Sequence, residues 1–272
     1  MISCKRDRGI TEVLDFGFGL NATEDLVTLC GGYVDVVRLG GAVAVLYPKD
    51  VLDKKIELLH RANIVVCTGG TMIERFIRDH GYDRLDAAFI DDYIAPLGFD
   101  RVEFATAYIR PTTEEFVKGI KKIRSRGYDV DFEIGFKSPD EDKSLTVEER
   151  VSLMVTALEA GATKLKIEGR EAGVDVGIYD EEGKVIRPML EEYLERMEKA
   201  GVSVDDVIWE APLKNQQIEL VKTIGPEVNL GNIPFGDRVL LLESYRQGVK
   251  YETVHLVKDG GMLDHGRDKW IK

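Results

Sequence analysis

Cysteine and histidine are scarce in this sequence of 272 residues. The three cysteines, Cys4, Cys30 and Cys67, are odd in number and unclustered, which argues against a disulfide framework and against a CxxC metal site. The four histidines fall in helix-like stretches or near the end of the chain, and none closes an expected strand. The sequence therefore favours neither a zinc cluster nor a catalytic triad built on histidine.

Long apolar runs and an excess of basic residues are also missing. The apolar stretches fall well short of the roughly 20 residues that a membrane helix needs, and no apolar segment follows the charged N-terminus as it would in a secretory signal. We therefore expect a cytoplasmic protein that does not contact membranes.

Lys and Arg number 37 against 49 Asp and Glu, a formal net charge of −12, so binding to nucleic acid is not expected. An anionic small-molecule substrate would need a few local cations, helix N-termini or a metal.

What the sequence does contain is a regular alternation of short β-branched runs and longer amphipathic segments. This alternation is typical of parallel strands joined by crossover helices. Several of the helix-like segments open with Thr or Asp followed by Glu and close with Gly, as helix caps require. Eight runs are expected to be strands: 11–16, 34–39, 63–68, 101–106, 129–134, 164–169, 206–211 and 227–232.

Eight such units without a Pro/Ser-rich linker predict an α/β fold, a single-domain (β/α)8 TIM barrel. The barrel is expected over residues 1–255, and a polar C-terminal tail over residues 256–272. A doubly wound open sheet is the alternative. That fold would be favoured by a GxGxxG motif after the first strand, and the segment "DFGFGL" does not supply one.

Polar residues occur at the carboxyl ends of the expected strands, where a barrel builds its active site. Glu133, Glu168 and Glu210 come from three consecutive strands, and such converging carboxylates are oxygen ligands of the kind that Mg²⁺ prefers. A single glutamate at a strand end is more often a salt-bridge partner of a neighbouring strand than a ligand, and three in succession make the two interpretations about equal. The residues expected to face a substrate are Asp15, Arg38, Gly69, Gly70, Thr71, Asn229 and Asn232.

Two loops have open interpretations. The segment "TGGT", residues 68–71, is either a tight turn with a threonine cap or a set of backbone N–H groups offered to an anion at a helix N-terminus. Arg170 and Glu171, in "IEGREAG", are either a solvated pair or part of a site.

Several segments resemble the phosphosulfolactate synthase family, whose members add sulfite to phosphoenolpyruvate on the route to coenzyme M. The resemblance runs from about residue 9 to about residue 255 and is carried most specifically by "IEGREAG" and "EAPLKNQQ". It implies a (β/α)8 barrel, Mg²⁺ as cofactor and a homo-oligomer, either a trimer or a tetramer. It also implies that Arg170 and Glu171 belong to the site with Glu168, and that Lys137 matches a family lysine.

The chemistry of such a site follows from the reaction. Addition of a nucleophile to C3 of an enolpyruvate places negative charge on the carboxylate as an enediolate, which Mg²⁺ on strand-end carboxylates would stabilise. The intermediate then needs a proton at C2, and a lysine close to the metal is a suitable donor because neighbouring charges tune its pKa. We therefore expect Lys137, Arg170 and Glu171 to be the catalytic residues, with Lys137 as the acid.

The sequence departs from the family pattern around the barrel mouth. Phe16 and Phe136 stand where the family has lysines, and "RLGGAVA" at 38–44 and "EFATA" at 103–107 replace more polar segments. Each charge-assisted contact to an anion is worth roughly 1.5–3 kcal/mol, so these changes bear on phosphate and sulfite binding. Three hypotheses stay open: sulfite addition to phosphoenolpyruvate, a related addition or elimination on a less anionic enoyl or enol acid, and a barrel that binds without catalysing.

Overall fold

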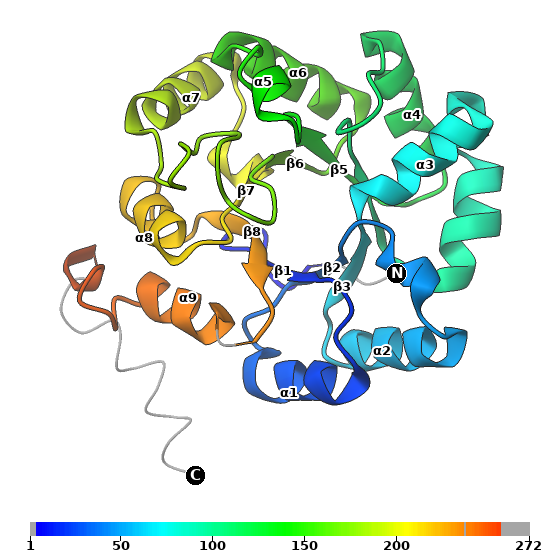
Figure 1. Ribbon diagram of the computed structural model, residues 1–272, viewed down its shortest axis with the longest axis horizontal. Coiled ribbons are helices and arrows are strands. Elements are labelled where there is room, and N and C mark those ends of the chain that lie inside the picture. Colours follow the sequence, from blue (N-terminus) through cyan, green and yellow to red (C-terminus); the bar gives the residue numbers. More distant parts are fainter. Residues whose placement is uncertain (1–3, 237, 257–272) are drawn as a thin grey trace.

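The computed structural model describes residues 4–236 and 238–256, which contain a closed barrel of eight parallel strands arranged in chain order (Figure 1). Each strand pairs with the strand before it, and β8 closes the barrel against β1. This arrangement confirms the predicted TIM barrel. The strands are β1 Thr11–Asp15, β2 Val36–Leu39, β3 Val65–Thr68, β4 Arg101–Phe104, β5 Asp129–Ile134, β6 Lys164–Ile167, β7 Val207–Glu210 and β8 Asn229–Pro234.

Helices surround the barrel on its outer side (Figure 1). Two of them begin with the capping boxes that the Thr-x-x-Glu pattern predicts, in which Thr112 pairs with Glu115 and Thr146 with Glu149. The α-helices of the described residues are α1 Leu20–Cys30, α2 Lys49–Arg61, α3 Gly70–His80, α4 Thr113–Ser125, α5 Pro139–Asp142, α6 Val147–Ala160, α7 Arg187–Ala200, α8 Lys214–Thr223 and α9 Arg238–Arg246. None of them combines the length and the apolar character that crossing a bilayer demands.

The two faces of the strands have opposite character, because successive side chains along a strand point to opposite sides of the sheet. Val13, Val37, Phe132 and Trp209 belong to the main hydrophobic core between strands and helices. The residues that alternate with them point into the barrel, and many of these are charged and buried. The apolar outer layer supports the fold, and the barrel interior is left for charged groups.

Most expected strand boundaries shift by one or two residues, and two differences from the expectation affect residues named above. Strand β8 begins at Asn229 and ends at Pro234, two residues later than expected, so Asn229 opens the strand instead of lying near its carboxyl end. The expected tail, residues 256–272, lies outside the described residues except for Leu256, which ends a short 3-10 helix, Val254–Leu256.

Candidate active site

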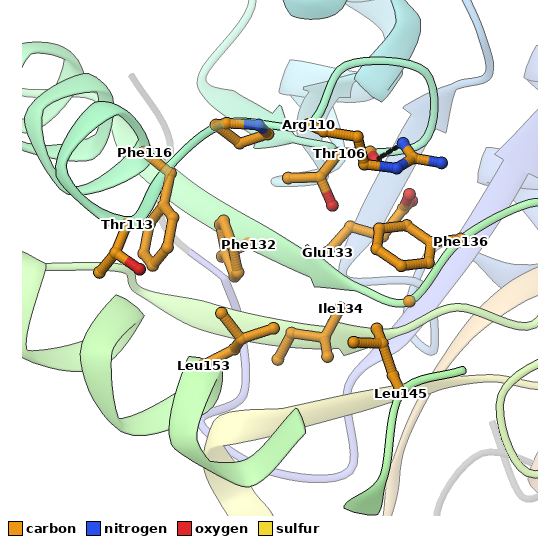
Figure 2. Close-up of a pocket in the computed structure, with 12 residues that line it drawn as sticks. Thr106, Arg110, Thr113, Phe116, Phe132, Glu133, Ile134, Phe136, Leu145 and Leu153 are labelled. Carbon is orange, nitrogen blue, oxygen red and sulfur yellow. Dashed lines mark hydrogen bonds between the residues drawn. The ribbon is translucent and has the colours of Figure 1, made fainter. Parts of the chain in front are cut away.

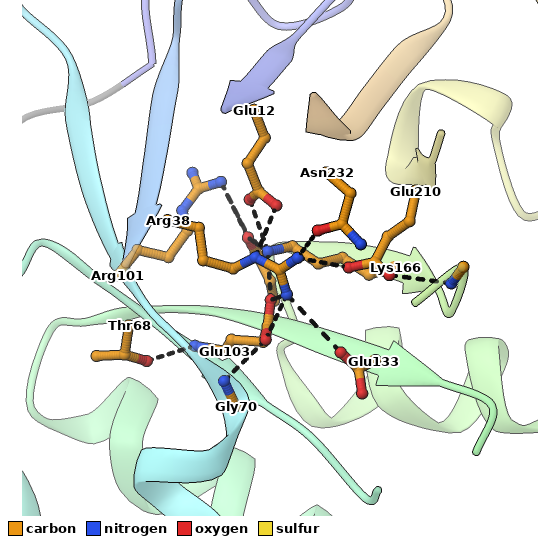
Figure 3. Close-up of polar contacts among 12 residues, drawn as sticks. Glu12, Arg38, Thr68, Gly70, Arg101, Glu103, Glu133, Lys166, Glu210 and Asn232 are labelled. Carbon is orange, nitrogen blue, oxygen red and sulfur yellow. Dashed lines mark hydrogen bonds and ion pairs between the residues drawn. The ribbon is translucent and has the colours of Figure 1, made fainter. Parts of the chain in front are cut away.

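Arg38 of β2 lies at the centre of the barrel mouth and joins carboxylates from three other strands (Figure 3). Its Nη1 donates to Glu103 Oε2 at 2.6 Å and its Nη2 to Glu210 Oε1 at 2.7 Å. Its Nε lies 3.2 Å from Glu12 Oε1, and Nη2 also donates to Asn232 Oδ1. Burial would lower the pKa of Arg38, but the surrounding glutamates outweigh burial and raise it, so the guanidinium stays charged.

Three carboxylates converge beside this arginine. Glu103, Glu133 and Glu210 each offer an oxygen, and these oxygens lie within 4.8 Å of one another; we call these residues the upper cluster. Arg38 lies closer to Glu103 and Glu210 than to Glu133, whose Oε2 is 3.9 Å from Arg38 Nη1. Glu133 is buried, and its Oε1 has no hydrogen-bond partner among the described residues. A buried carboxylate left in this state must bind a proton or a cation.

The three carboxylates therefore differ in acidity. Burial first, and then the charge of Glu168, raises the pKa of Glu133 well above its usual value. Burial also raises the pKa of Glu210, to about 7. Burial acts in the same direction on Glu103, but Arg38 and Lys166 outweigh it and lower the pKa of Glu103 to about 2. In the upper cluster, Glu103 is therefore ionised at neutral pH, whereas Glu133 and Glu210 are weaker acids than an ordinary glutamate.

Glu168, expected among the metal ligands, is directed to a lysine instead. Lys137 Nζ donates to Glu168 Oε1 at 3.1 Å and Oε2 at 2.9 Å, and Oε1 also accepts the backbone N–H of Arg170 at 2.7 Å. Arg170 has a positive φ of 56°, and its carbonyl accepts a bond from Asn232. Burial would lower the pKa of Lys137, but Glu133 and Glu168 outweigh burial and raise it. Lys137 is therefore a protonated donor held at the mouth.

A cavity of about 150 Å³ opens above these groups. Gly70 and Thr71, at the N-terminus of α3, form part of its wall, and the N–H of Gly70 donates to Glu103 Oε1 at 2.8 Å. The neighbouring Gly69 lies too close to Gly41 to accept a Cβ atom, which would come within 2.4 Å of the Gly41 backbone. The predicted site residues that line this cavity are Arg38, Gly70, Thr71, Glu133, Lys137 and Glu171.

Two predicted substrate-binding residues have partners elsewhere. Asp15 is buried, accepts the N–H groups of Gly17 and Phe18 at 2.8 and 2.9 Å, and lies 2.5 Å from Lys55 Nζ of α2. It shapes the loop after β1. Asn229 lies at the amino end of β8, where it accepts the N–H of Ile10 at 2.9 Å and donates to backbone carbonyls. Both residues support the barrel wall through the contacts that they make.

Sequence reasoning missed a second group of buried acids deeper in the barrel. Glu12, Cys67 and Asp131 also place ligand-type atoms within 4.8 Å of one another, and we call them the lower cluster. Lys166 Nζ lies among them, 2.6 Å from Glu12 Oε2 and 3.4 Å from Asp131 Oδ2, and it reaches Glu103 Oε2 at 2.7 Å. The signal was the alternation of charged and apolar residues in "RVEF", "DVDFEI" and "KLKIEG".

The upper cluster fits a hard divalent cation. Its donors are all carboxylate oxygens, which suit Mg²⁺, and Glu133 Oε1 is left without a partner among the described residues.

Comparison with known proteins identifies the family. The family described as "(2R)-phospho-3-sulfolactate synthase (ComA)" matches residues 3–252. A phosphosulfolactate synthase of Methanocaldococcus jannaschii is 37% identical over 246 residues, covering 90% of this chain and 94% of that protein. One from Methanothermobacter thermautotrophicus is 33% identical over 249 residues, covering 92% of each. One from Bacillus subtilis is 29% identical over 251 residues, covering 92% of this chain and 94% of that protein.

Solved structures agree on the fold alone. A 3-hexulose-6-phosphate synthase aligns with a TM-score of 0.53 at 17% identity, covering 87% of this chain and 98% of that one. A type I 3-dehydroquinate dehydratase from Clostridium difficile aligns with a TM-score of 0.53 at 14% identity, covering 90% and 95%. Taken with the sequence matches and the closed barrel, these findings show that the chain belongs to the phosphosulfolactate synthase family.

Proposed function

We propose that this chain adds sulfite to phosphoenolpyruvate in a Mg²⁺-dependent reaction that passes through an enediolate. The observation that carries the proposal is the upper cluster, where an unpartnered oxygen of Glu133 lies among converging carboxylates. The family match over residues 3–252 supports the same reaction. The net change is the loss of the C2=C3 double bond, with a new C–S bond at C3 and a new C–H bond at C2.

The upper cluster and Lys137 would have different roles in this reaction. Glu103, Glu133 and Glu210 would hold Mg²⁺, which supplies a Lewis acid for the negative charge that develops on the substrate carboxylate. Lys137 holds a proton at Nζ, its two bonds to Glu168 fix the position of the ammonium, and the residue lines the mouth cavity. Lys137 would deliver it to C2 after the nucleophile has attacked C3.

The substrate's charged end would lie on the opposite wall of the cavity. Gly70 and Thr71 begin α3, and the N-terminus of a helix favours negative charge. The N–H of Gly70 already donates to Glu103 and that of Met72 donates to the Gly69 carbonyl, so Thr71 would be the residue of this turn that contacts a substrate anion. We retain Arg170 and Glu171 as proposed catalytic residues, because Arg170 fixes Glu168 through its backbone and Glu171 lines the cavity.

A second candidate is a related addition on a less anionic enoyl or enol acid. The observation that favours it is the state of the two cations at the cavity, Arg38 and Lys137, which are both already paired with carboxylates. Phe16 lines the same cavity as an apolar side chain. A substrate with fewer negative charges would need fewer cationic partners from the residues that line this cavity.

The test is a direct product assay. Purified protein is incubated with Mg²⁺, phosphoenolpyruvate and sulfite, and phosphosulfolactate is sought by mass spectrometry, with a magnesium-free control. The Glu133→Gln variant should form no product, and Glu148→Gln, an exposed change on α6, should match the wild type. Product that requires magnesium supports the first candidate. Folded protein that binds Mg²⁺ but forms no product points to the second, and protein that does neither contradicts both.

A further inference from the structure

A second cavity, of about 110 Å³, opens beside the upper cluster, between β5 and the helices α4 and α6 (Figure 2). Glu133 lines both this cavity and the cavity at the mouth, so the two spaces are neighbours at this residue. We call the second space the side pocket. Its apolar wall consists of Phe116, Phe132, Ile134, Phe136, Leu145 and Leu153.

The side pocket offers little to an anion. Among the described residues that line it, Arg110 is the cationic one, and its guanidinium lies 4.0 Å from the centre of the Phe136 ring. Its Nη2 donates to Glu141 Oε2 at 2.7 Å, and its Nη1 donates to the carbonyls of Thr106 and Ala107 at 2.7 and 3.0 Å. The charge of Arg110 is therefore already used, and a phosphate or sulfonate in the side pocket would remain unpaired.

The side pocket has the polar side chains of Glu133 and Thr106 on the side of the mouth and that of Thr113 beside Phe116 (Figure 2). Glu133 is 1% exposed, and its Oε1 is buried without a hydrogen-bond partner among the described residues. The Thr106 hydroxyl points into the same space in Figure 2. A ligand that extends from the mouth would therefore meet polar groups first and an apolar wall beyond them.

We propose that the side pocket binds an uncharged hydrocarbon substituent of a carboxylic acid substrate whose reacting end lies in the mouth cavity. This inference rests on the second candidate function and names the substrate feature that it requires. In other proteins, an apolar cavity of about 150 Å³ holds a benzene molecule. The side pocket, at about 110 Å³, therefore suits a branched chain of about three to five carbons. Burial of one methylene is worth roughly 0.8 kcal/mol, which corresponds to about fourfold in affinity.

The experiment is calorimetric titration of the Mg²⁺-loaded protein with acetate, butyrate, 3-methylbutanoate and 4-methylpentanoate. Affinity should rise about fourfold with each added carbon until the side pocket is filled. Phe136→Lys, which places a charge in the wall of the pocket, should weaken the binding of 4-methylpentanoate relative to that of acetate at least about tenfold. Leu46→Lys, the same kind of change at a side chain that is 80% exposed, is the matched control.

A second variant covers the chance that Phe136→Lys disturbs the loop. Leu153→Ala enlarges the side pocket and should shift the preferred acid to a longer chain. Equal affinity for all four acids in the wild type would overturn this inference, even if phosphoenolpyruvate and sulfite give product. Absence of any Mg²⁺-dependent binding of these acids, together with no product in the assay above, would overturn the proposed function as well.

Discussion

The lower and upper clusters are built from similar residues, yet they differ in how their charge is balanced. In the lower cluster, Lys166 Nζ lies within ion-pair distance of Glu12 and Asp131, and Arg101 Nη1 lies 3.3 Å from Asp131 Oδ1. The third member, Cys67, is kept as a neutral thiol, because burial raises its pKa well above the usual value. An ammonium thus occupies the place that a metal ion would take.

The third member of the upper cluster, Glu133, is paired less closely. Arg38 reaches Glu103 and Glu210 at 2.6 and 2.7 Å but Glu133 at 3.9 Å, and Glu133 Oε1 has no hydrogen-bond partner among the described residues. The comparison teaches that the carboxylates of the lower cluster are closely paired with cations, whereas Glu133 keeps an oxygen free, which is why we propose it as a metal ligand.

The largest effect is expected from removing the cation of the lower cluster. Lys166→Met leaves Glu12 and Asp131 buried without their ammonium, which should lower the free energy of unfolding by about 3–5 kcal/mol. Urea denaturation at pH 7 measures this loss. Lys54→Met, at a side chain 61% exposed, is the control and should change stability by less than about 0.5 kcal/mol. Equal stability of Lys166→Met and wild type would show that the lower cluster does not depend on its ammonium.

Removal of the lysine at the mouth should affect turnover instead. Lys137→Met removes the proton donor, and general acid catalysis contributes about 100- to 10,000-fold, so we expect kcat to fall by about 1,000-fold. Steady-state kinetics on whichever substrate pair gives product measures the change, with Lys143→Met, at an exposed lysine of the same loop, as control. A kcat within about threefold of the wild type would remove Lys137 from the role of acid.

The pH dependence of stability should differ between the clusters. The pKa of Glu210 in the folded protein, about 7, lies above the 4.5 of an ordinary glutamate, so the folded state holds this proton more tightly than the unfolded chain. The contribution of Glu210 to stability therefore falls as pH rises from about 4.5 to 7, by about 3 kcal/mol, and the raised pKa of Glu133 adds to the fall.

Urea titrations at pH 5, 6, 7 and 8 measure this trend. The Glu210→Gln variant should show a flatter profile than the wild type, and Mg²⁺ should flatten the wild-type profile because it stabilises the ionised carboxylates. A wild-type profile that rises between pH 5 and 8, or one identical to that of Glu210→Gln, would contradict the raised pKa values of Glu210 and Glu133.

The smallest effect is expected at the amino end of the barrel. Asn229→Ala removes bonds to Ile10, Asp205 and Val207, which should lower stability by about 1–2 kcal/mol and leave KM unchanged. The same change at Asn232, which contacts Arg38 and the carbonyl of Arg170, should alter the kinetics. A changed KM in Asn229→Ala with the wild-type stability would return Asn229 to the substrate site.

The fold could be predicted because the strands are short, largely apolar runs that alternate with longer amphipathic segments, and because α4 and α6 begin at the capping boxes of Thr112 and Thr146. All eight expected strands match β1 to β8 within two residues at either end. Strand β8 is shifted by two residues from the expected range. Because barrel strands are short, this shift is enough to move Asn229 from near the carboxyl end of the strand to its amino end. The site therefore depends on the strand boundaries, which a pattern fixes least well.

The site could be predicted only in part. The glutamates at strand ends were recognisable, but the pairing of Glu168 with Lys137 depends on the turn after β6, where Arg170 has a positive φ. Glu103 joins Glu133 and Glu210 because the strands of a barrel are staggered, and its distance from them along the chain does not reveal this. Lys166 was missed because it lies within its strand, two residues before the expected ligand Glu168.

The measurement that tests the central claim most directly is a calorimetric titration of Mg²⁺ at pH 8 into the wild type, Glu133→Gln and Asp131→Asn. The account predicts one Mg²⁺ bound by the wild type, binding at least about tenfold weaker in Glu133→Gln, and binding unchanged in Asp131→Asn where that variant is folded. Absence of Mg²⁺ binding in the wild type, or a loss of binding in folded Asp131→Asn but not in Glu133→Gln, would contradict it.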